Sequence, residues 1–277
     1  MKKIELDLVV ETTENEIDMQ YGLETLKGTS DVVTLVSEAI LQGGIAKTGR
    51  RTASSNNLRT KLKQSFKGSF GQRFSIEVED KELICKLKKM GDVVFLDVLT
   101  YFIMEALYLD SGDLSEEAYK VIDELEGLTD NLFRRIDSPL KEMHKISKYY
   151  DYDVKLRYRK RGDKVKQLVK LTRETSSHLT DLLIDRNVKE IDAIIMRYHS
   201  KTGNGRLYVK GHEEFYSFGY GTELDQVKTE LKRKISENLH VNNAVSSEEG
   251  TYMKLRVMRK LLPSGDVIKF LVVGVLE

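Results

Sequence analysis

The order of periodic segments in residues 186–277 constrains the fold more than any other feature of this sequence. Apolar and polar residues alternate with period two, as in strands, in three segments before residue 221 and in two after residue 250. Between them, apolar residues recur at helical spacing, at Leu224, Val227, Leu231, Ile235 and Leu239. The predicted order is β-β-β-α-β-β. It is typical of a five-stranded OB-type barrel, in which one helix joins the third and fourth strands.

Residues 1–185 are predicted to form a separate mixed α/β domain, because the segments after them make a complete unit on their own. Residues 3–10 alternate with period two, and residues 16–19 are expected to return as the second strand of a hairpin. A helix then follows from residue 23 to residue 41, and a second hairpin turns at Lys67 and Gly68. The first third of the chain is therefore predicted as two strands, a helix and two strands.

The remainder of this domain is predicted to be mainly helical. A period near 3.6 between residues 81 and 148 indicates three or four helices, and Pro139 is expected to kink or restart the last of them. A third hairpin turns at residues 161–163, and a short helix is expected over residues 176–185. Together the patterns predict an α+β protein: an N-terminal antiparallel sheet with a helical layer, residues 1–185, and a C-terminal OB-like barrel, residues 186–277.

Composition narrows the class of protein. Forty-five Lys and Arg residues oppose forty-four Asp and Glu residues, so the net charge of +1 gives no general attraction for nucleic acid or acidic membranes. One Cys, two Pro and 40% hydrophobic residues exclude disulfide-scaffold, collagen-like and fully disordered chains. No clean apolar run reaches the ~20 residues of a spanning helix, and the first residues lack the apolar core of a secretion signal. The chain is expected to be cytoplasmic, with Cys85 as a buried hydrophobic residue.

The most one-sided stretch of charge lies between residues 47 and 73, which contain no acidic residue. Its first half is rich in small polar residues, so its arginines are expected to close on a phosphate or a carboxylate through their forked donors. The cations predicted to contact phosphate are Lys47, Arg50, Arg51, Arg59 and Lys61. The alternative is a solvated hairpin face whose charge is balanced by acidic helices.

A second basic run covers residues 155–173, and its alternation places Lys155, Arg157 and Arg159 on one face of a strand. We interpret this ridge first as a protection against edge-to-edge pairing, with phosphate contact as the alternative. Residues 105–130 are acidic instead. Opposite charges of this kind favour self-association or docking to a charged protein partner.

The predicted barrel carries its own candidate surface. OB barrels bind oligonucleotides or sugars on the face of strands two and three, where aromatic rings stack on bases and cations meet phosphates. Alternation in strand two directs Leu207 and Val209 inward and the candidate binding residues Arg206, Tyr208 and Lys210 outward. Aromatic and cationic residues are also ordinary strand residues, so protein binding or a purely structural role is the alternative.

Enzymatic interpretations find less support. The glycines before Lys47 and Thr48 do not have the spacing of a P-loop. Glu77, Glu79 and Lys81 resemble half of a metal-dependent nuclease motif, without a matching Asp on a preceding hairpin. The histidines show no metal-ligand spacing and no nucleophile lies near them. The sequence therefore predicts no catalytic residues, no metal and no cofactor.

The helix LETLKGTSDVVTLVSEAIL, the hairpin LRTKLKQSFKGSFGQRFSIEV and the strand GRLYVKG resemble a group of uncharacterised bacterial and mobile-element proteins. The resemblance extends over nearly the whole chain and implies an α/β N-terminal domain followed by a five-stranded β-barrel. It also implies a bacterial or phage setting, with a role in phage defence or its evasion. It carries no catalytic residues over to this sequence.

These observations predict a non-catalytic binding protein that recognises nucleic acid or a phosphorylated ligand through the basic loop and the barrel. A homo-oligomer or a larger protein assembly is expected, and no membrane. The alternative is a protein–protein interaction module, such as an inhibitor or an assembly subunit, that binds no nucleic acid. A distant alternative is a metal-dependent nuclease built around Glu77 and Glu79.

Overall fold

The structure is a computed structural model that describes residues 1–13, 16–44, 57–66, 70–160, 165–200, 202–243 and 250–276. Its internal contacts divide the chain into two compact units. The first unit comprises Met1–Leu107 and Ser111–Thr180, and the second comprises Tyr108–Asp110 and Asp181–Glu277. The short segment Tyr108–Asp110 thus belongs to the second unit although both its neighbours in sequence belong to the first.

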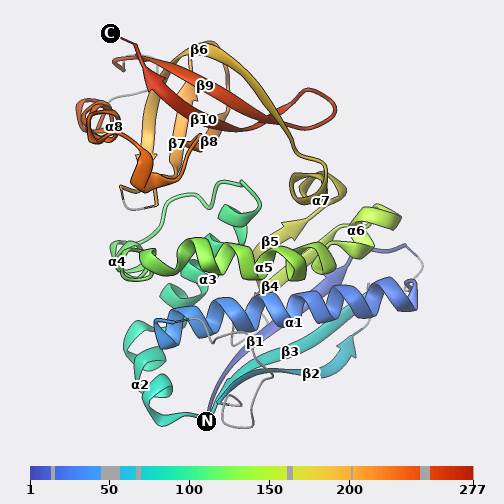
Figure 1. The fold of residues 1–277 in the computed structure, drawn as a ribbon. Coiled ribbons are helices and arrows are strands. Elements are labelled where there is room, and N and C mark those ends of the chain that lie inside the picture. The colour runs from blue at the N-terminus through green and yellow to red at the C-terminus, as the bar shows by residue number, and fades with distance from the viewer. Residues whose placement is uncertain are drawn as a thin grey trace. The chain divides into compact units, whose positions relative to one another are not determined.

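A five-stranded antiparallel sheet forms the centre of the first unit (Figure 1). Its strands are β1 (Lys2–Val10), β2 (Leu58–Phe66), β3 (Phe70–Val78), β4 (Val154–Arg159) and β5 (Val165–Leu171). The order across the sheet is β2-β3-β1-β4-β5, so the first strand of the chain is central. The hairpin pairs β2–β3 and β4–β5, predicted from alternation, are confirmed. Their predicted turn residues lie outside the described residues.

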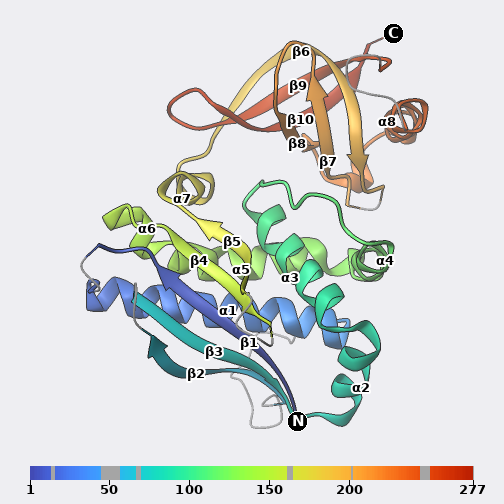
Figure 2. The ribbon, with the colours of Figure 1, turned by 180° about the vertical axis from the view of Figure 1, so that it is seen from behind.

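Helices cover one face of this sheet, with α1, α3 and α5 lying against it (Figure 2). The helices of the first unit are α1 (Met19–Gln42), α2 (Lys81–Met90), α3 (Asp92–Ala106), α4 (Glu116–Glu124), α5 (Thr129–Met143), α6 (Lys145–Tyr150), α7 (Arg173–Thr180) and the 3-10 turn η2 (Glu126–Leu128). Alternate residues of β1, Ile4, Leu6 and Leu8, are buried in the core beside this layer.

The longest helix, α1, is positioned by residues that the sequence supplies at three places. Asp18 caps its first turn by accepting a hydrogen bond of 2.9 Å from Tyr21 N. Gly43 ends it in the left-handed region, at φ 64°. In between, Gly28 allows a close approach to α5, because a Cβ there would lie 2.3 Å from Met143 N and 2.6 Å from Pro139 O. Helix α5 continues through Pro139.

The second unit contains strands β6 (Leu183–Tyr198), β7 (Gly205–Val209), β8 (Phe215–Tyr220), β9 (Met253–Leu261) and β10 (Val267–Val275), with η3 (Leu224–Gln226) and α8 (Thr229–Val241) between β8 and β9. Pairs β6–β7, β7–β8, β6–β9 and β9–β10 are antiparallel, and β8–β10 is parallel. The predicted element order is therefore confirmed. Inward side chains such as Leu207, Phe218 and Val257 form one core with Ile235 of α8.

Several expectations about local structure are wrong. Residues 16–19 form no strand, because Asp18 and Met19 begin α1, so the first third of the chain reads strand, helix, strand, strand. Residues 81–150 form five α-helices and a 3-10 turn instead of three or four helices. Cys85 is exposed, since Leu87 is the buried residue of α2. Finally, α7 ends at Thr180 and β6 begins at Leu183, where the sequence predicted helix.

Candidate functional site

A dense set of charged side chains lies on the face of the first sheet that points away from α1, α3 and α5. Even-numbered residues of β1 enter the core, so its odd-numbered residues point to the opposite face. Residues opposite each other in the register share that face. We call this surface the charged sheet face, and among the described helices none lies over it (Figure 2). Its charged residues include Lys3, Glu5, Asp7, Arg59, Lys61, Lys63, Arg73, Glu77, Arg157 and Arg159.

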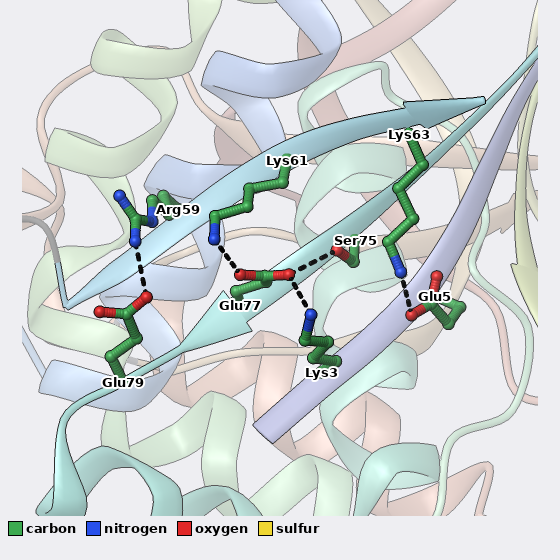
Figure 3. Close-up of polar contacts among 8 residues, drawn as sticks. All are labelled: Lys3, Glu5, Arg59, Lys61, Lys63, Ser75, Glu77 and Glu79. Atoms are coloured by element: carbon green, nitrogen blue, oxygen red, sulfur yellow. Dashed lines mark hydrogen bonds and ion pairs between the residues drawn. The ribbon is translucent and has the colours of Figure 1, made fainter. Parts of the chain in front are cut away.

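Glu77 is a buried carboxylate on this face, only 1% exposed. Its Oε1 lies 2.7 Å from Lys3 Nζ and its Oε2 lies 2.7 Å from Lys61 Nζ, while Ser75 Oγ lies 3.4 Å from Oε1 (Figure 3). Hydrogen bonds from Lys3 and then Lys61, which outweigh the effect of burial, lower the pKa of Glu77 to about 2. The carboxylate is therefore charged at neutral pH and neutralises one of its two lysines.

This arrangement changes the interpretation of the predicted phosphate-binding cations. Arg59 Nη2 donates to Glu79 Oε1 over 2.6 Å, and Lys61 is held by Glu77, so both cations already have carboxylate partners (Figure 3). Their opposing carboxylates come from β3 and its end, at positions that the register places beside β2. The prediction that Arg59 and Lys61 are open to phosphate is not supported by these contacts. Lys47, Arg50 and Arg51 lie outside the described residues.

The same contacts bear on the nuclease alternative. Glu77 and Glu79 are each paired with cations, and Lys81 begins α2. In the part of the chain that the structure describes, no group of three or more His, Cys, Asp or Glu side chains is placed to hold a metal ion. Glu77 and Glu79 therefore form ion pairs with lysine and arginine side chains of their own sheet.

A second buried carboxylate, Asp7, lies in the central strand and is 0% exposed. In the register it faces Arg73 of β3 on one side and Arg157 of β4 on the other. Arg159 holds Asp7 with two hydrogen bonds, Nε to Oδ1 over 3.2 Å and Nη2 to Oδ2 over 2.6 Å. Arg157 Nη2 reaches Oδ2 at 3.5 Å, which is the limit of a hydrogen bond. Asp7 thus pairs chiefly with Arg159.

An aromatic ring organises the three arginines around Asp7. The guanidinium carbons of Arg73, Arg157 and Arg159 lie 5.6, 5.8 and 5.7 Å from the centroid of the Phe66 ring, within the range of cation–π attraction. Gly71 makes room for this ring, because a Cβ there would lie 2.4 Å from Phe66 Cζ. We call Phe66, Arg73, Arg157 and Arg159, with Asp7, the arginine cluster.

One of the predicted nucleic-acid-binding residues is buried in the second unit. Arg206 in β7 is only 3% exposed. Its Nη1 donates to the carbonyl oxygen of Tyr108 over 3.0 Å, and its Nη2 donates to that of Leu109. The expectation that Arg206 is open to a phosphate is therefore wrong, because its guanidinium holds the segment Tyr108–Asp110 within this unit.

Tyr208 and Lys210 lie on the outside of the second sheet, as predicted. The Tyr208 ring lies 5.9 Å from that of its cross-strand partner Phe215, which is 47% exposed. Lys210 Nζ lies 5.4 Å from the centroid of the Tyr252 ring. We call Tyr208, Lys210, Phe215 and Tyr252 the β7–β8 surface. The alternate aromatic stripe of β8, including Phe218, packs into the core.

Two features of the sequence relate to the arginine cluster: Asp7 in the first strand, and the alternating arginines Arg157 and Arg159. Asp7 follows Lys3 and Glu5 at the polar positions of an alternating strand, and a carboxylate that is buried at the centre of a sheet needs cations from its neighbouring strands. Arg157 and Arg159 were first assigned to edge protection. In the structure β4 is an inner strand between β1 and β5, so it needs no such protection.

Comparisons with known proteins identify no relative: no family model, no curated protein and no solved structure matches this chain. Among the helices of the described residues, none combines the length and the apolar character that are needed to cross a membrane.

Proposed function

We propose that this chain is a non-catalytic binding protein that recognises nucleic acid, and that its second unit is an OB-like barrel. The strand pairings support the barrel: β6, β7 and β8 pair in series, β8 pairs in parallel with β10, and β9 pairs with both β10 and β6. With α8 between the third and fourth strands, this connectivity agrees with the one expected for a five-stranded OB barrel, which supports the proposal.

The observation that carries the functional proposal is the β7–β8 surface. It presents the exposed ring of Phe215 beside that of Tyr208, on the two strands that OB barrels use for ligands. Bases of a single strand stack on such rings without regard to sequence. Lys210, which directly follows β7, supplies a cation for the phosphate backbone. Duplex nucleic acid offers no free base faces, so we expect single strands to bind more tightly.

The test is fluorescence anisotropy of labelled single-stranded DNA and RNA with the full chain, at low and near-physiological salt. We expect salt-sensitive binding. The double variant Tyr208→Ala with Phe215→Ala should weaken it by roughly tenfold or more, since stacking contributes ~1–3 kcal/mol per base. Tyr119→Ala is the control, because Tyr119 is an exposed tyrosine of α4 in the other unit. No binding at low salt, or equal binding by the double variant, would refute the proposal.

A second candidate function, the protein–protein interaction module, is favoured by exposed apolar and aromatic side chains at the start of α1 and the end of α6. Met19 is 78% exposed, Leu23 is 56% exposed and Tyr149 is 53% exposed. Tyr149 also stacks on Tyr21 at 4.5 Å, with Tyr150 beside them at 5.9 Å from Tyr21. Tyr and Met are enriched in interfaces. If these exposed side chains join two copies of the chain, sedimentation should show a dimer that Met19→Ser with Tyr149→Ser converts to monomer. A wild-type monomer at all concentrations would contradict it.

A further inference from the structure

The arginine cluster contains guanidinium donors for which the described residues supply no acceptor. Among the described residues, no hydrogen bond or ion pair holds the guanidinium group of Arg73, whose contact is with the Phe66 ring. Its Nε is buried and has no acceptor. Arg157 is similar: its Nε is also buried without an acceptor, and among the described residues its ion pair is the 3.5 Å contact with Asp7. A buried donor without a partner costs ~1–3 kcal/mol, so both arginines would gain from an acceptor.

The charge of the cluster is also unbalanced. Three guanidinium groups surround the single carboxylate of Asp7, which Arg159 already holds with two hydrogen bonds. The other carboxylates of the charged sheet face have their own partners: Glu5 pairs with Lys63, and Glu77 pairs with Lys3 and Lys61. Within the arginine cluster two positive charges therefore remain, on Arg73 and Arg157, which the register places on either side of Asp7.

The two arginines are held in place before any ligand arrives. The ring of Phe66 lies against Gly71 and attracts both guanidinium groups, and the side chain of Arg157 is only 25% exposed. Arginine side chains that are already ordered lose less conformational freedom when they bind. Asp7 lies on the central strand between them in the register. An exposed, mobile basic patch would have neither property.

We propose that Arg73 and Arg157 form a binding site for a phosphomonoester group, with Phe66 and Asp7 positioning them. A phosphate oxyanion has several acceptor oxygens, which suit two forked donors. A phosphomonoester carries ~−1.5 to −2 charge near neutral pH, which matches the two uncompensated arginines. A phosphodiester of a nucleic-acid backbone carries a single charge, so the site prefers a terminal phosphate, from a free nucleotide or from the 5′ end of a strand. The site lies in the first unit and does not rest on the β7–β8 surface.

The experiment compares two otherwise identical oligonucleotides, one with a 5′-phosphate and one with a 5′-hydroxyl group, both labelled at the 3′ end, in anisotropy titrations with the full chain. We expect the 5′-phosphate to bind roughly tenfold tighter, as for a charge-assisted bidentate contact. Inorganic phosphate should compete away this gain and leave the binding of the 5′-hydroxyl strand unchanged. A nucleoside 5′-monophosphate, used as a competitor, distinguishes a free nucleotide from a 5′-phosphorylated strand as the ligand. If it competes as well as the 5′-phosphorylated strand, a free nucleotide is sufficient for binding.

Conservative variants identify the residues. Arg73→Lys and Arg157→Lys keep the charge and remove the fork, so each should abolish most of the 5′-phosphate gain. Lys170→Met is the matched control: it removes one cation from the same sheet, where Lys170 pairs with Asp153 at 2.6 Å, and should leave the gain intact. Circular dichroism verifies that the variants fold. Equal affinity for the two oligonucleotides, or a 5′-phosphate gain in affinity that both lysine variants retain, refutes the proposed phosphate site even if both strands bind. Binding of the 5′-phosphate strand without binding of the 5′-hydroxyl strand supports the phosphate site and refutes the proposed binding by the β7–β8 surface.

Discussion

The buried ion triad of Glu77 leads to a quantitative prediction about stability and pH. Replacing Glu77 by Gln keeps the size of the side chain and removes its charge, so Lys3 and Lys61 lose their shared partner. The pair of lysines then faces the neutral amide from opposite sides, and their mutual repulsion is no longer offset. We expect the variant to fold, because neither lysine is fully buried, and to be less stable than the wild type at neutral pH.

The size of the effect follows from the pKa of Glu77, which lysine hydrogen bonds lower from 4.5 to about 2. One pKa unit corresponds to about 1.4 kcal/mol, so the shift sets an upper limit of about 3 kcal/mol. The lysine side chains are 38% and 44% exposed, and water screens their charges. We therefore expect Glu77→Gln to lower the free energy of unfolding by about 1–2 kcal/mol near neutral pH.

The sign of the pH dependence distinguishes this mechanism from a general loss of packing. Because the folded-state pKa is lower than the unfolded one, the contribution of Glu77 is complete above its ordinary pKa of 4.5 and is lost as the pH falls through about 2. The difference between wild type and variant should shrink over that window, in urea titrations followed by circular dichroism. Glu79→Gln, in an exposed pair with Arg59, is the control and should change stability by less than ~1 kcal/mol. A Glu77→Gln effect that equals the control, or that persists undiminished at low pH, would show that the reasoning is wrong.

Three further predictions test the packing. Gly28→Ala should lower the stability measured by thermal unfolding by ~1–3 kcal/mol, because its Cβ would meet the backbone of α5. Gly22→Ala in the same helix is the control and should be near neutral, because its Cβ would meet only the flexible side chain of Ile17. Equal effects of the two substitutions would contradict the close approach of α1 and α5. Burial lowers the pKa of His144 to about 4, so the ring of the folded protein should stay neutral in NMR titrations down to about pH 5, whereas in urea it should titrate near 6.5. The free energy of unfolding should therefore fall as the pH drops from about 6.5 toward 4. A His144 ring that titrates near 6.5 in the folded protein would contradict this prediction. Asn238→Ala removes Asn238 Oδ1, which accepts a hydrogen bond of 2.9 Å from Ile195 N. Hydrogen exchange of the Ile195 amide should therefore accelerate roughly tenfold or more. An unchanged exchange rate would mean that this hydrogen bond contributes nothing to the protection of the amide.

Much of the fold could be predicted because it is specified by local patterns. The hairpins β2–β3 and β4–β5 and the whole order of the second unit follow from alternation interrupted by turn residues. The failures are also local in origin. Residues 16–19 have strand-like alternation, but Asp18 is a better helix cap than a strand residue, and a four-residue segment holds too little information to decide between them.

The candidate site was predicted only in part, because its chemistry depends on pairs that are distant in the sequence. Tyr208 and Lys210 are on the outside of the sheet as alternation requires. Arg206 has the same alternation but is covered by Tyr108 and Leu109, about which strand periodicity says nothing. Arg59 and Lys61 looked unopposed in a stretch without acidic residues, yet their partners arrive from the neighbouring strand.

The sequence by itself determined most of the strands, the element order of the second unit and the faces that point to each core, since hydrophobic periodicity is a property of neighbours along the chain. Tertiary structure alone decided which charges are neutralised. Asp7 and Arg157 are 150 residues apart and become neighbours only through the register of β1 with β4. That register leaves Arg73 and Arg157 with unused donors and gives Lys61 a carboxylate, because the interaction of two charges depends on their distance in space and not along the chain.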